Sequence, residues 1–432
     1  MTIRLGIAGG NRGGSFERSL ASLEEEIELV AVCDPSDEVL RGWIDKRSGL
    51  EAFSNFEDLI ESPNIDAVFV ATPMPFHAAQ SMMALNAGKH VLSEVIAATT
   101  LDECYALVET VEQTGMTYMM AENYCYRREA MMIKNMTDSQ TFGDLTYAEG
   151  AYIHDCRDLM FDSTLARTWR GGSWGKSGDQ KTHSSRGNGY PTHSLGPIAQ
   201  WLEINRSDRL TLTTTFVTGS LARRDWALSV LPEGHIDATE DAWSDFTDSA
   251  TTLIQTEKGR VICLRKDSAS PRPHNMALHS LQGTKGAYIS GRHTNEDPLV
   301  WINGISTGVS PANFGYKDMA RPPELLDAQS AEWQPLWELS NQYEHPYWKE
   351  YGSEATKAGH GGGDYFIMRD FALAVSGKID PPIDVYDAAT WSSVFPISME
   401  NVNRMGEPLK IPDFRKNRYP AKQSHRPYQE NS

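Results

Sequence analysis

A glycine-rich turn directly follows the first apolar segment of the chain, and it is the first place where the sequence suggests chemistry. Residues 3–8 predict a short buried strand, and the run Gly9–Gly14 then contains four glycines. Backbone N–H groups in such a turn can hold a pyrophosphate. Ala8, Gly10 and Gly13 would take the three positions of the dinucleotide fingerprint, so the pattern is irregular at its first glycine. A plain turn without a ligand is the alternative.

Asp34 closes the second apolar run, 24 residues after Gly10. A carboxylate at that place accepts hydrogen bonds from ribose hydroxyls and repels a 2′-phosphate. The spacing therefore favours NAD over NADP. The alternative is structural, because Asp34 precedes Pro35 and could cap the next helix.

Two further side chains could transfer protons. His193 lies where a turn rich in Gly and Pro meets an apolar helix, and the unperturbed pKa of histidine is near neutrality. Tyr152 lies on a strand-like segment, and His154 shares its face because side chains alternate along a strand. His193 could instead be a residue of the helix cap, and Tyr152 could be a core or surface tyrosine.

Metal and nucleic-acid chemistry are not expected. The five cysteines are scattered without a CxxC pair, which suits neither a zinc site nor a disulfide framework and indicates a reducing compartment. Acidic residues outnumber basic ones by 58 to 40, and a net charge of −18 argues against nucleic acid and anionic membranes. No stretch is apolar enough to span a membrane and no signal peptide is visible, so a cytoplasmic location is expected.

The elements that must position these residues change in character near residue 125. In residues 1–125, strands alternate with helices, which predicts a doubly wound parallel Rossmann sheet. In residues 126–432, longer strands with alternating polarity predict an α/β domain with an open, largely antiparallel sheet for substrate binding and oligomerisation. The expected strands and helices of the first part are 3–8, 15–26, 27–33, 38–48, 67–72, 77–87, 90–93, 101–114 and 117–121.

The segment GKHVLSEVIAATTLDEC (88–104) resembles the Gfo/Idh/MocA oxidoreductase family. Where that family commonly has Glu-Lys-Pro with an acid/base lysine, this chain has Glu94-Val95-Ile96. The NAD-dependent glycoside hydrolases of the α-N-acetylgalactosaminidase kind also carry Glu-Val there. Resemblance to this branch extends over the following segments: MMAENYCYRREAMMIKNM (119–136), GAYIHDCRD (150–158), TWR (168–170), GNGYPTHSLGPIAQWLEINR (187–206), GTKGAY (283–288), GHGGGDYFIMRDF (359–371) and PPIDVYDAATWSSVFPIS (381–398).

The resemblance implies roles for two sets of residues. The implied NAD contacts are Gly10, Asn11, Arg12, Gly13, Asp34, Thr72, Phe76, His77, Glu94, Val95 and Asn123. The implied sugar contacts are Tyr152, His154, Arg170, Tyr190, Thr192 and His193, of which His193 and Tyr152 would be catalytic. By the same resemblance, the protein is expected to be a homo-oligomer that acts on a sugar or glycoside.

The chemistry expected is hydrolysis through transient oxidation. A glycosidase normally needs two carboxylates, and no persuasive pair is present. Oxidation of the sugar at C3 would acidify the C2 proton, whose loss expels the aglycone from C1 before NADH returns the hydride. The alternatives are a sugar 3-dehydrogenase that releases NADH and a sensor without turnover. A long basic loop would favour an anionic sugar if its cations converged; they are Arg157, Arg167, Arg170, Lys181 and Arg186.

Overall fold

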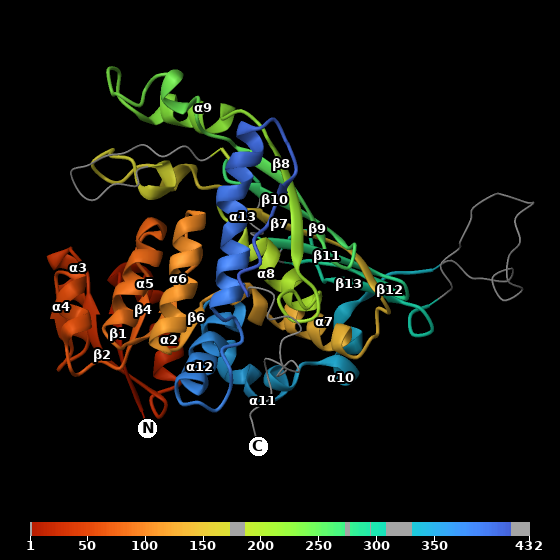
Figure 1. Ribbon diagram of the computed structural model, residues 1–432, viewed down its shortest axis with the longest axis horizontal. Coiled ribbons are helices and arrows are strands. Elements are labelled where there is room, and N and C mark those ends of the chain that lie inside the picture. The colour runs from red at the N-terminus through yellow and green to blue at the C-terminus, as the bar shows by residue number, and fades with distance from the viewer. Residues whose placement is uncertain (1, 173–185, 273–276, 294, 308–330, 416–432) are drawn as a thin grey trace, which may run out of the picture.

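The computed structural model describes residues 2–172, 186–272, 277–293, 295–307 and 331–415, which form two sheets joined by helices (Figure 1). A six-stranded parallel sheet is built from the N-terminal part, and a nine-stranded mixed sheet from the rest. The expected combination of a Rossmann sheet and an open, largely antiparallel sheet is therefore confirmed. No helix among the described residues is long and apolar enough to cross a membrane.

The parallel sheet has the strand order β3-β2-β1-β4-β5-β6. The chain adds β2 and β3 on one side of β1 and then β4, β5 and β6 on the other side, so the order of connection switches between β1 and β4. The apolar runs of the sequence form these strands because both faces of the sheet are covered by helices. The strands are β1 (Ile3–Ala8), β2 (Ile27–Cys33), β3 (Glu51–Phe53), β4 (Ala67–Val70), β5 (His90–Ser93) and β6 (Tyr118–Met120). The helices are α1 (Gly10–Gly13), α2 (Glu17–Ala21), α3 (Asp37–Lys46), α4 (Phe56–Glu61), α5 (His77–Asn86) and α6 (Leu101–Thr114).

In place of one helix at 15–26, the structure has three short helical elements. They are α1, a 3-10 turn at Gly14–Phe16, and α2, which ends at Ala21. Glycine lowers helix stability by about 1 kcal/mol relative to alanine, and three glycines fall within these first turns. The boundary expected near residue 125 stays a prediction, because helices from the far end of the chain return to the Rossmann part.

The second sheet has the order β14-β13-β12-β11-β7-β10-β9-β8-β15. Neighbouring strands are antiparallel except for β7 and β10, which are parallel. The strands are β7 (Leu145–Ile153), β8 (Leu210–Val217), β9 (Ser249–Thr256), β10 (Val261–Asp267), β11 (Ala277–Gly283), β12 (Gly286–Ile289), β13 (Leu299–Ile302), β14 (Gln334–Pro335) and β15 (Leu409–Lys410). The helices of this part are α7 (Arg128–Asp138), α8 (Thr192–Trp201), α9 (Leu221–Val230), α10 (Ser340–Tyr343), α11 (Pro346–Ala355), α12 (Gly363–Val375) and α13 (Val385–Asn403).

Helix α13 runs between the two sheets, where Figure 1 shows it in blue. It contacts α6 and β6 on the Rossmann side and β8 on the other, while α12 contacts α2. Helix α8 packs on β7, β10 and β11. One face of the second sheet, called here the inner face, is thus covered by α8 and α13, and it carries Tyr152 toward the Rossmann domain.

A small lobe lies above the Rossmann sheet in Figure 1 and is made of residues 156–172 and 218–248. Its own apolar core contains Met160, Ala227 and Trp243, together with Leu231 and Phe246. The first segment was expected as an irregular loop; it contains the 3-10 turns Arg157–Leu159 and Trp169–Gly171. This upper lobe carries residues that line a cavity described below.

Candidate active site

The expected cofactor residues gather at one edge of the Rossmann sheet. Strands β1, β2, β4, β5 and β6 end there, because parallel strands have their carboxyl ends on the same side. The glycine turn follows β1, Asp34 follows β2, Thr72 and His77 follow β4, and Glu94 follows β5. Residues that are far apart in sequence are therefore neighbours at the topological switch point of the sheet.

The glycines of the turn are required by close packing. A Cβ on Gly9 would lie 2.4 Å from the carbonyl oxygen of Ala71, and Gly9 has a φ of 93°. A Cβ on Gly13 would lie 2.3 Å from Cγ2 of Ile7. The turn therefore lies directly against the strand ends, as a pyrophosphate-binding loop must.

Asp34 is tied to the same turn. Its Oδ2 accepts a hydrogen bond of 2.9 Å from the backbone N–H of Gly10, and its Oδ1 accepts one of 3.0 Å from Ser36. The cap of helix α3 is Ser36 rather than Asp34. The capping alternative for Asp34 is thereby removed, and its carboxylate lies at the place expected for a ribose contact.

Arg12 and Glu94 connect the turn with the loop after β5. Nε of Arg12 donates a hydrogen bond of 2.5 Å to Oε1 of Glu94. His77 connects the loops after β4 and β5, because its ring nitrogens lie 2.7 Å from the carbonyl oxygen of Thr72 and 2.9 Å from that of Ile96. Burial lowers the pKa of His77. Both ring nitrogens are thus engaged by the backbone, so His77 would support the cofactor loops rather than contact NAD through its ring.

Asn123 is buried and receives support from the C-terminal part of the chain. Its Nδ2 donates a hydrogen bond of 3.1 Å to Oδ1 of Asp364, and Oδ2 of Asp364 lies 2.8 Å from Nδ1 of His360. Oδ1 of Asn123 has no hydrogen-bond partner among the residues that the structure describes. A buried polar atom without a partner favours a ligand there, and with the tight glycine turn and Asp34 it fits NAD.

A prediction follows for Asp34. The variant Asp34→Ala should bind NADH about tenfold or more weakly, because hydrogen bonds to a charged group contribute about 1.5–3 kcal/mol. It should lose less affinity for NADPH, since the repulsion of the 2′-phosphate is also removed. Titration calorimetry with both nucleotides measures the two affinities. The exposed Asp37→Ala is the matched control, and equal losses for NADH and NADPH would refute the role of Asp34.

His193 forms a dyad with a carboxylate that the sequence analysis did not select. Nδ1 of His193 donates a hydrogen bond of 2.7 Å to Oε1 of Glu122, which is fully buried. The carboxylate fixes the ring orientation and the tautomer, so Nε2 is free to accept a proton. The ring is surrounded by Tyr124, Tyr152 and Tyr190, with centroid distances of 4.4, 5.0 and 5.1 Å.

Two glycines allow α8 to bring His193 so close. A Cβ on Gly150 of β7 would lie 2.2 Å from the carbonyl oxygen of Ser194 in α8. A Cβ on Gly196 would lie 2.8 Å from Cγ of Glu122. The helix therefore contacts both the strand of Tyr152 and the loop of Glu122 at backbone distance, which places His193 between them.

Tyr152 has a partner of its own. Its hydroxyl lies 2.7 Å from Nδ1 of His154 and donates to it when that nitrogen carries no proton. Burial raises the pKa of Tyr152 well above its ordinary value, while the charge of Arg170 acts in the opposite direction. The hydroxyl is therefore protonated at neutral pH, and Tyr152 can take up another proton only if it passes its own to His154.

The other expected sugar contacts occupy the same region. The ring of Tyr190 stacks on that of Tyr152 at 5.2 Å, and its hydroxyl donates to the carbonyl oxygen of Val95 at 3.3 Å. The guanidinium of Arg170 lies 5.7 Å from the centre of the Tyr190 ring. Thr192 is fully buried at the start of α8, so it would contact a ligand only through its unpartnered hydroxyl.

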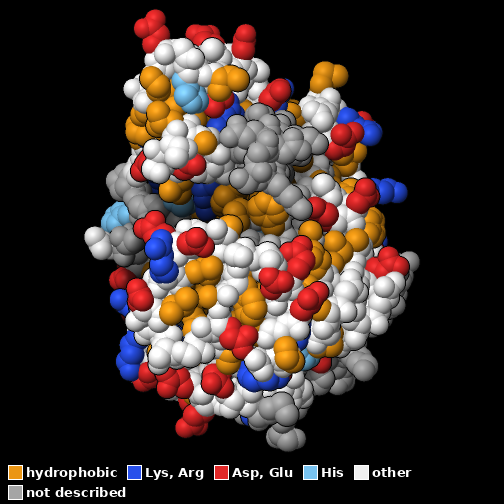
Figure 2. All heavy atoms as spheres, turned by 90° about the vertical axis from the view of Figure 1, so that its left-hand side faces the viewer, with side chains coloured by type: hydrophobic (Ala, Val, Ile, Leu, Met, Phe, Trp, Pro, Cys, Tyr) orange, Lys and Arg blue, Asp and Glu red, His pale blue; other side chains and the backbone are white. Residues whose placement is uncertain are grey.

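These side chains surround a cavity of about 60 Å³ between the upper lobe and the Rossmann domain. Figure 2 shows the hollow on this side of the molecule, with apolar and basic side chains at its floor. The described residues that line it are Met74, Tyr152, Cys156, Trp169, Arg170, Gly172, Gly189, Tyr190, Arg223, Lys266, Ser268 and Phe395. None of them is a carboxylate.

The basic loop does not converge as a whole. Arg157 pairs with Asp155 at 2.7 Å, and Arg167 pairs with Asp237 at 2.7 Å. Arg186 is exposed, and Lys181 lies outside the described residues. Arg170 alone among the described cations of this loop lines the cavity. The condition for an anionic sugar, that several of these cations converge, is therefore not met by Arg157 and Arg167, because nearby carboxylates already neutralise them.

Sequence reasoning missed Glu122, Arg223 and Lys266. Glu122 could have been found, because it adjoins Asn123 at the end of an expected strand where the site residues meet. Lys266 lies near the end of β10, and only the register of this strand, which pairs it with Tyr152, places it beside the cavity residues. Arg223 lies on α9, whose position depends on the packing of the upper lobe.

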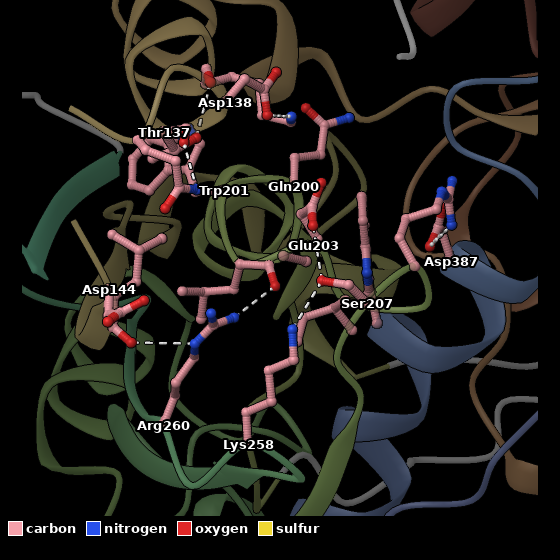
Figure 3. A pocket seen from close by; sticks show the side chains of 18 of the residues that line it. Thr137, Asp138, Asp144, Gln200, Trp201, Glu203, Ser207, Lys258, Arg260 and Asp387 are labelled. Atoms are coloured by element: carbon pink, nitrogen blue, oxygen red, sulfur yellow. Dashed lines mark hydrogen bonds and ion pairs between the residues drawn. The ribbon is translucent and has the colours of Figure 1, made fainter. Parts of the chain in front are cut away.

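A second cavity, of about 410 Å³, lies away from the nucleotide edge, where α7 and α8 end (Figure 3). Its basic side chains already have partners. Arg206 pairs with Asp387 at 2.8 Å, and Arg260 pairs with Asp208 at 3.3 Å. This cavity contains none of the expected site residues, so it is not the candidate active site. Among the described side chains, no cluster of three or more potential metal ligands occurs.

The two sheets and the nucleotide edge define a class of protein: one with a dehydrogenase-like NAD-binding Rossmann domain and an open-sheet domain packed against it. Residues 3–122 match the family described as "Oxidoreductase family, NAD-binding Rossmann fold". A solved structure of levoglucosan dehydrogenase in complex with NADH and levoglucosan is similar, with a TM-score of 0.70 and 17% identity over 95% of this chain and 100% of that chain. An oxidoreductase domain protein from Kribbella flavida also has a TM-score of 0.70 at 17% identity, over 95% and 99% of the two chains.

Residues 126–421 match the family described as "Glycosyl hydrolase 109, C-terminal domain". A glycosyl hydrolase family 109 protein from Solibacter usitatus is 32% identical over 98% of this chain and 90% of the relative. A protein named alpha-N-acetylgalactosaminidase from Shewanella oneidensis is 31% identical over 95% and 85%. The chain therefore belongs to glycosyl hydrolase family 109 and is an enzyme of the glycosidase kind, which confirms the expected family.

Proposed function

We propose that the protein is an NAD-dependent glycoside hydrolase that cleaves its substrate through transient oxidation of the sugar. The observation that carries the proposal is the pairing of two proton-transfer dyads, His193 with Glu122 and Tyr152 with His154, whose rings meet beside one cavity. The described lining of that cavity contains no carboxylate. Among the described residues of this lining, hydrolysis by two flanking carboxylates therefore has no acid pair to use.

NAD held at the Rossmann edge by Asp34, Asn123 and the glycine turn would supply reversible acceptance of a hydride from C3 of the sugar. His193 takes the proton of the 3-hydroxyl on Nε2, and the carboxylate of Glu122 stabilises the imidazolium that forms. In the last step, His193 returns this proton to the same oxygen. The sugar is therefore oxidised and reduced without net change at C3.

Tyr152 acts on the C2 proton, which the neighbouring ketone makes acidic. The tyrosine oxygen accepts this proton while its own proton passes to Nδ1 of His154. The electron pair of the C2–H bond forms the C1–C2 double bond, the bond from C1 to the aglycone oxygen breaks, and that oxygen takes a proton from solvent. Water then adds its oxygen to C1 and loses one proton to solvent, while the pair returns a proton to C2. Arg170 is positively charged and lies beside Tyr152. Its charge stabilises the negative charge that develops both when the C2 proton leaves and when it returns.

Glu122 is a positioning residue in this scheme. The variant Glu122→Gln should lower kcat by at least about tenfold with little change in KM, since general acid–base catalysis contributes about 10²–10⁴-fold in total. Glu122→Asp, which keeps the carboxylate, should recover part of the lost kcat. Glu129→Gln on α7 is the control. An unchanged kcat in Glu122→Gln would contradict the dyad.

Aglycone release separates this function from its rivals. The purified protein is incubated with nitrophenyl glycosides of several sugars in both anomers, and nitrophenol and NADH are followed together. The hydrolase releases nitrophenol over many turnovers without net NADH. Stoichiometric NADH without nitrophenol would establish the sugar 3-dehydrogenase instead, and binding with neither product would establish the sensor.

We also propose that the protein is a homo-oligomer in the cytoplasm. The outer face of the second sheet exposes Leu253, Val261 and Ile289 to 45%, 36% and 42%. The strand register places these three side chains on one face. Apolar faces of this kind favour a subunit contact. The free thiols of all five cysteines suit a reducing compartment.

A further inference from the structure

Three basic side chains from three separate elements line the substrate cavity. Lys266 lies on β10 directly beside Tyr152 of β7, on the inner face of the sheet. Arg223 comes from α9, and Arg170 from the turn at Trp169–Gly171. Lys266 and Arg223 are only 6% and 4% exposed. The upper lobe and the sheet thus bring buried positive charge to one point.

Lys266, Arg223 and Arg170 have no ion pair with any described carboxylate. The guanidinium of Arg223 donates to the carbonyl oxygen of Arg170 at 3.2 Å and to Oγ of Ser268, and its Nε has no hydrogen-bond partner. Arg170 lies 3.5 Å from Sγ of Cys156. For Lys266, the described residues provide neither a hydrogen bond nor an ion pair.

The second cavity shows the usual arrangement for comparison. Figure 3 shows Lys258 joined to Ser207 by a dashed line, and Arg206 donates a hydrogen bond of 2.8 Å to Oδ2 of Asp387. Burying a cation without such a partner costs several kcal/mol, and like charges side by side add to that cost. The stability of the fold therefore does not explain the three unpaired cations of the substrate cavity.

The cost of burying this charge is reflected in the pKa of Lys266. Burial and, after it, the charge of Arg223 lower the pKa of Lys266 to about 7, while Cys156 and Asp267 act in the opposite direction. The other ionisable group that faces it is Tyr152, which is neutral, and Arg170 adds further positive charge. A ligand with a negative charge would reverse the balance, because it would stabilise the charged ammonium and satisfy Arg223.

We infer that the substrate is a glycoside whose sugar carries a carboxylate or a sulfate, and that Lys266, Arg223 and Arg170 bind this group. The inference rests on the proposed function for its sugar, because Tyr152 lines the same cavity and its ring centroid lies 5.0 Å from that of His193. Its volume of about 60 Å³ has room for a few water-sized groups, which suits one acidic substituent of a sugar ring. The guanidinium of an arginine and the ammonium of a lysine are the usual partners of such oxyanions.

The test compares substrates that differ only in the acid group. Nitrophenyl galactosides and glucosides, in both anomers, are compared with the corresponding galacturonides, glucuronides and 6-sulfates. We expect at least one acidic substrate to have a kcat/KM at least 100-fold above its neutral partner. In Lys266→Met this preference should fall at least tenfold, whereas Lys258→Met, a lysine of the second cavity, should keep it. Lys266→Met should fold, because the replaced side chain leaves no described partner behind.

Binding provides a readout without turnover. Calorimetric titration with galacturonate and glucuronate, against galactose and glucose, should show that the wild type binds an acid more tightly at pH 6 than at pH 9. The sign follows from the protonation of Lys266, whose charge is present below a pKa of about 7 and lost above it. Lys266→Met should bind the acid weakly and with little pH dependence. Inorganic sulfate should compete with the acid in the wild type.

The outcomes separate the two proposals. Turnover of neutral glycosides in preference to all acidic ones would overturn the acid-binding site and leave the hydrolase intact. Equal losses on acidic and neutral substrates in Lys266→Met would also overturn it, because the lysine would then act on the reacting atoms. If no glycoside is cleaved but acids bind in a Lys266-dependent manner, the hydrolase fails and the acid-binding site stands. Equal binding of acids and neutral sugars would overturn the site.

Discussion

Replacement of His193 by alanine should lower kcat/KM for glycoside cleavage by about 10³-fold or more, within the range of general acid–base catalysis. The dyad with Glu122 supplies the base that takes the 3-hydroxyl proton. Without that base, oxidation of the sugar does not start. Nitrophenol release by the purified variant, at several substrate concentrations, measures the loss.

NAD affinity distinguishes a catalytic loss from a folding defect in His193→Ala. His193 lies on α8, outside the strand ends that hold the glycine turn and Asp34. The dissociation constant for NADH should therefore change by less than about threefold, which is under 1 kcal/mol. The exposed His293→Ala is the matched control. Full activity in His193→Ala would remove His193 from the mechanism.

Replacement of Tyr152 by phenylalanine should separate the two halves of the reaction. The ring still packs against Tyr190 and His193, but the hydroxyl that accepts the C2 proton is gone. Aglycone release should fall by about 10²–10⁴-fold. Because His193 and Glu122 are intact, oxidation at C3 should persist, and NADH should accumulate to about one equivalent per site.

Rapid mixing of Tyr152→Phe with an accepted glycoside, followed by NADH absorbance and nitrophenol together, checks this separation. Tyr147→Phe is the matched control, because Tyr147 lies on the same strand but points to the outer face. Its hydroxyl contacts Glu149 instead of the site. If Tyr152→Phe loses NADH formation and aglycone release equally, Tyr152 is not the base for C2.

The fold could be predicted where the local sequence pattern alone identifies a strand or a helix. Continuous apolar runs mark buried parallel strands, so β1, β2 and β5 were expected at their observed bounds. The short strand β3 was missed, because its three residues, Glu51–Phe53, carry little apolar signal. The upper lobe was also missed, since its small core joins segments about 60 residues apart in the chain.

The site could be predicted only in part for the same physical reason. Asp34, His193 and Tyr152 are recognisable by residue type next to turns, strands or family motifs. His154 was recognisable because it shares the strand face of Tyr152, whereas the partner Glu122 becomes meaningful only when α8 approaches it at Gly196. Lys266 and Arg223 depend on strand register and on the docking of α9, and neither leaves a local signal in the sequence.

The net charge of −18 does not predict the local charge of the candidate site. Most basic side chains of the upper lobe are neutralised by neighbours, as Arg167 is by Asp237. The cations that face the substrate are few, buried and unpaired with described carboxylates. An acidic protein can therefore offer a locally positive cavity, which is where the acid-binding site is inferred.

The central claim is that the glycosidic bond breaks by elimination after oxidation, and one isotope measurement tests it most directly. An accepted glycoside is hydrolysed in deuterated water by the NAD-loaded protein, and the released sugar is examined by NMR and mass spectrometry. The account predicts one deuterium at C2 in the product, with the C3 hydrogen retained and no net NADH. Complete retention of the original hydrogen at C2 during full hydrolysis would contradict the account.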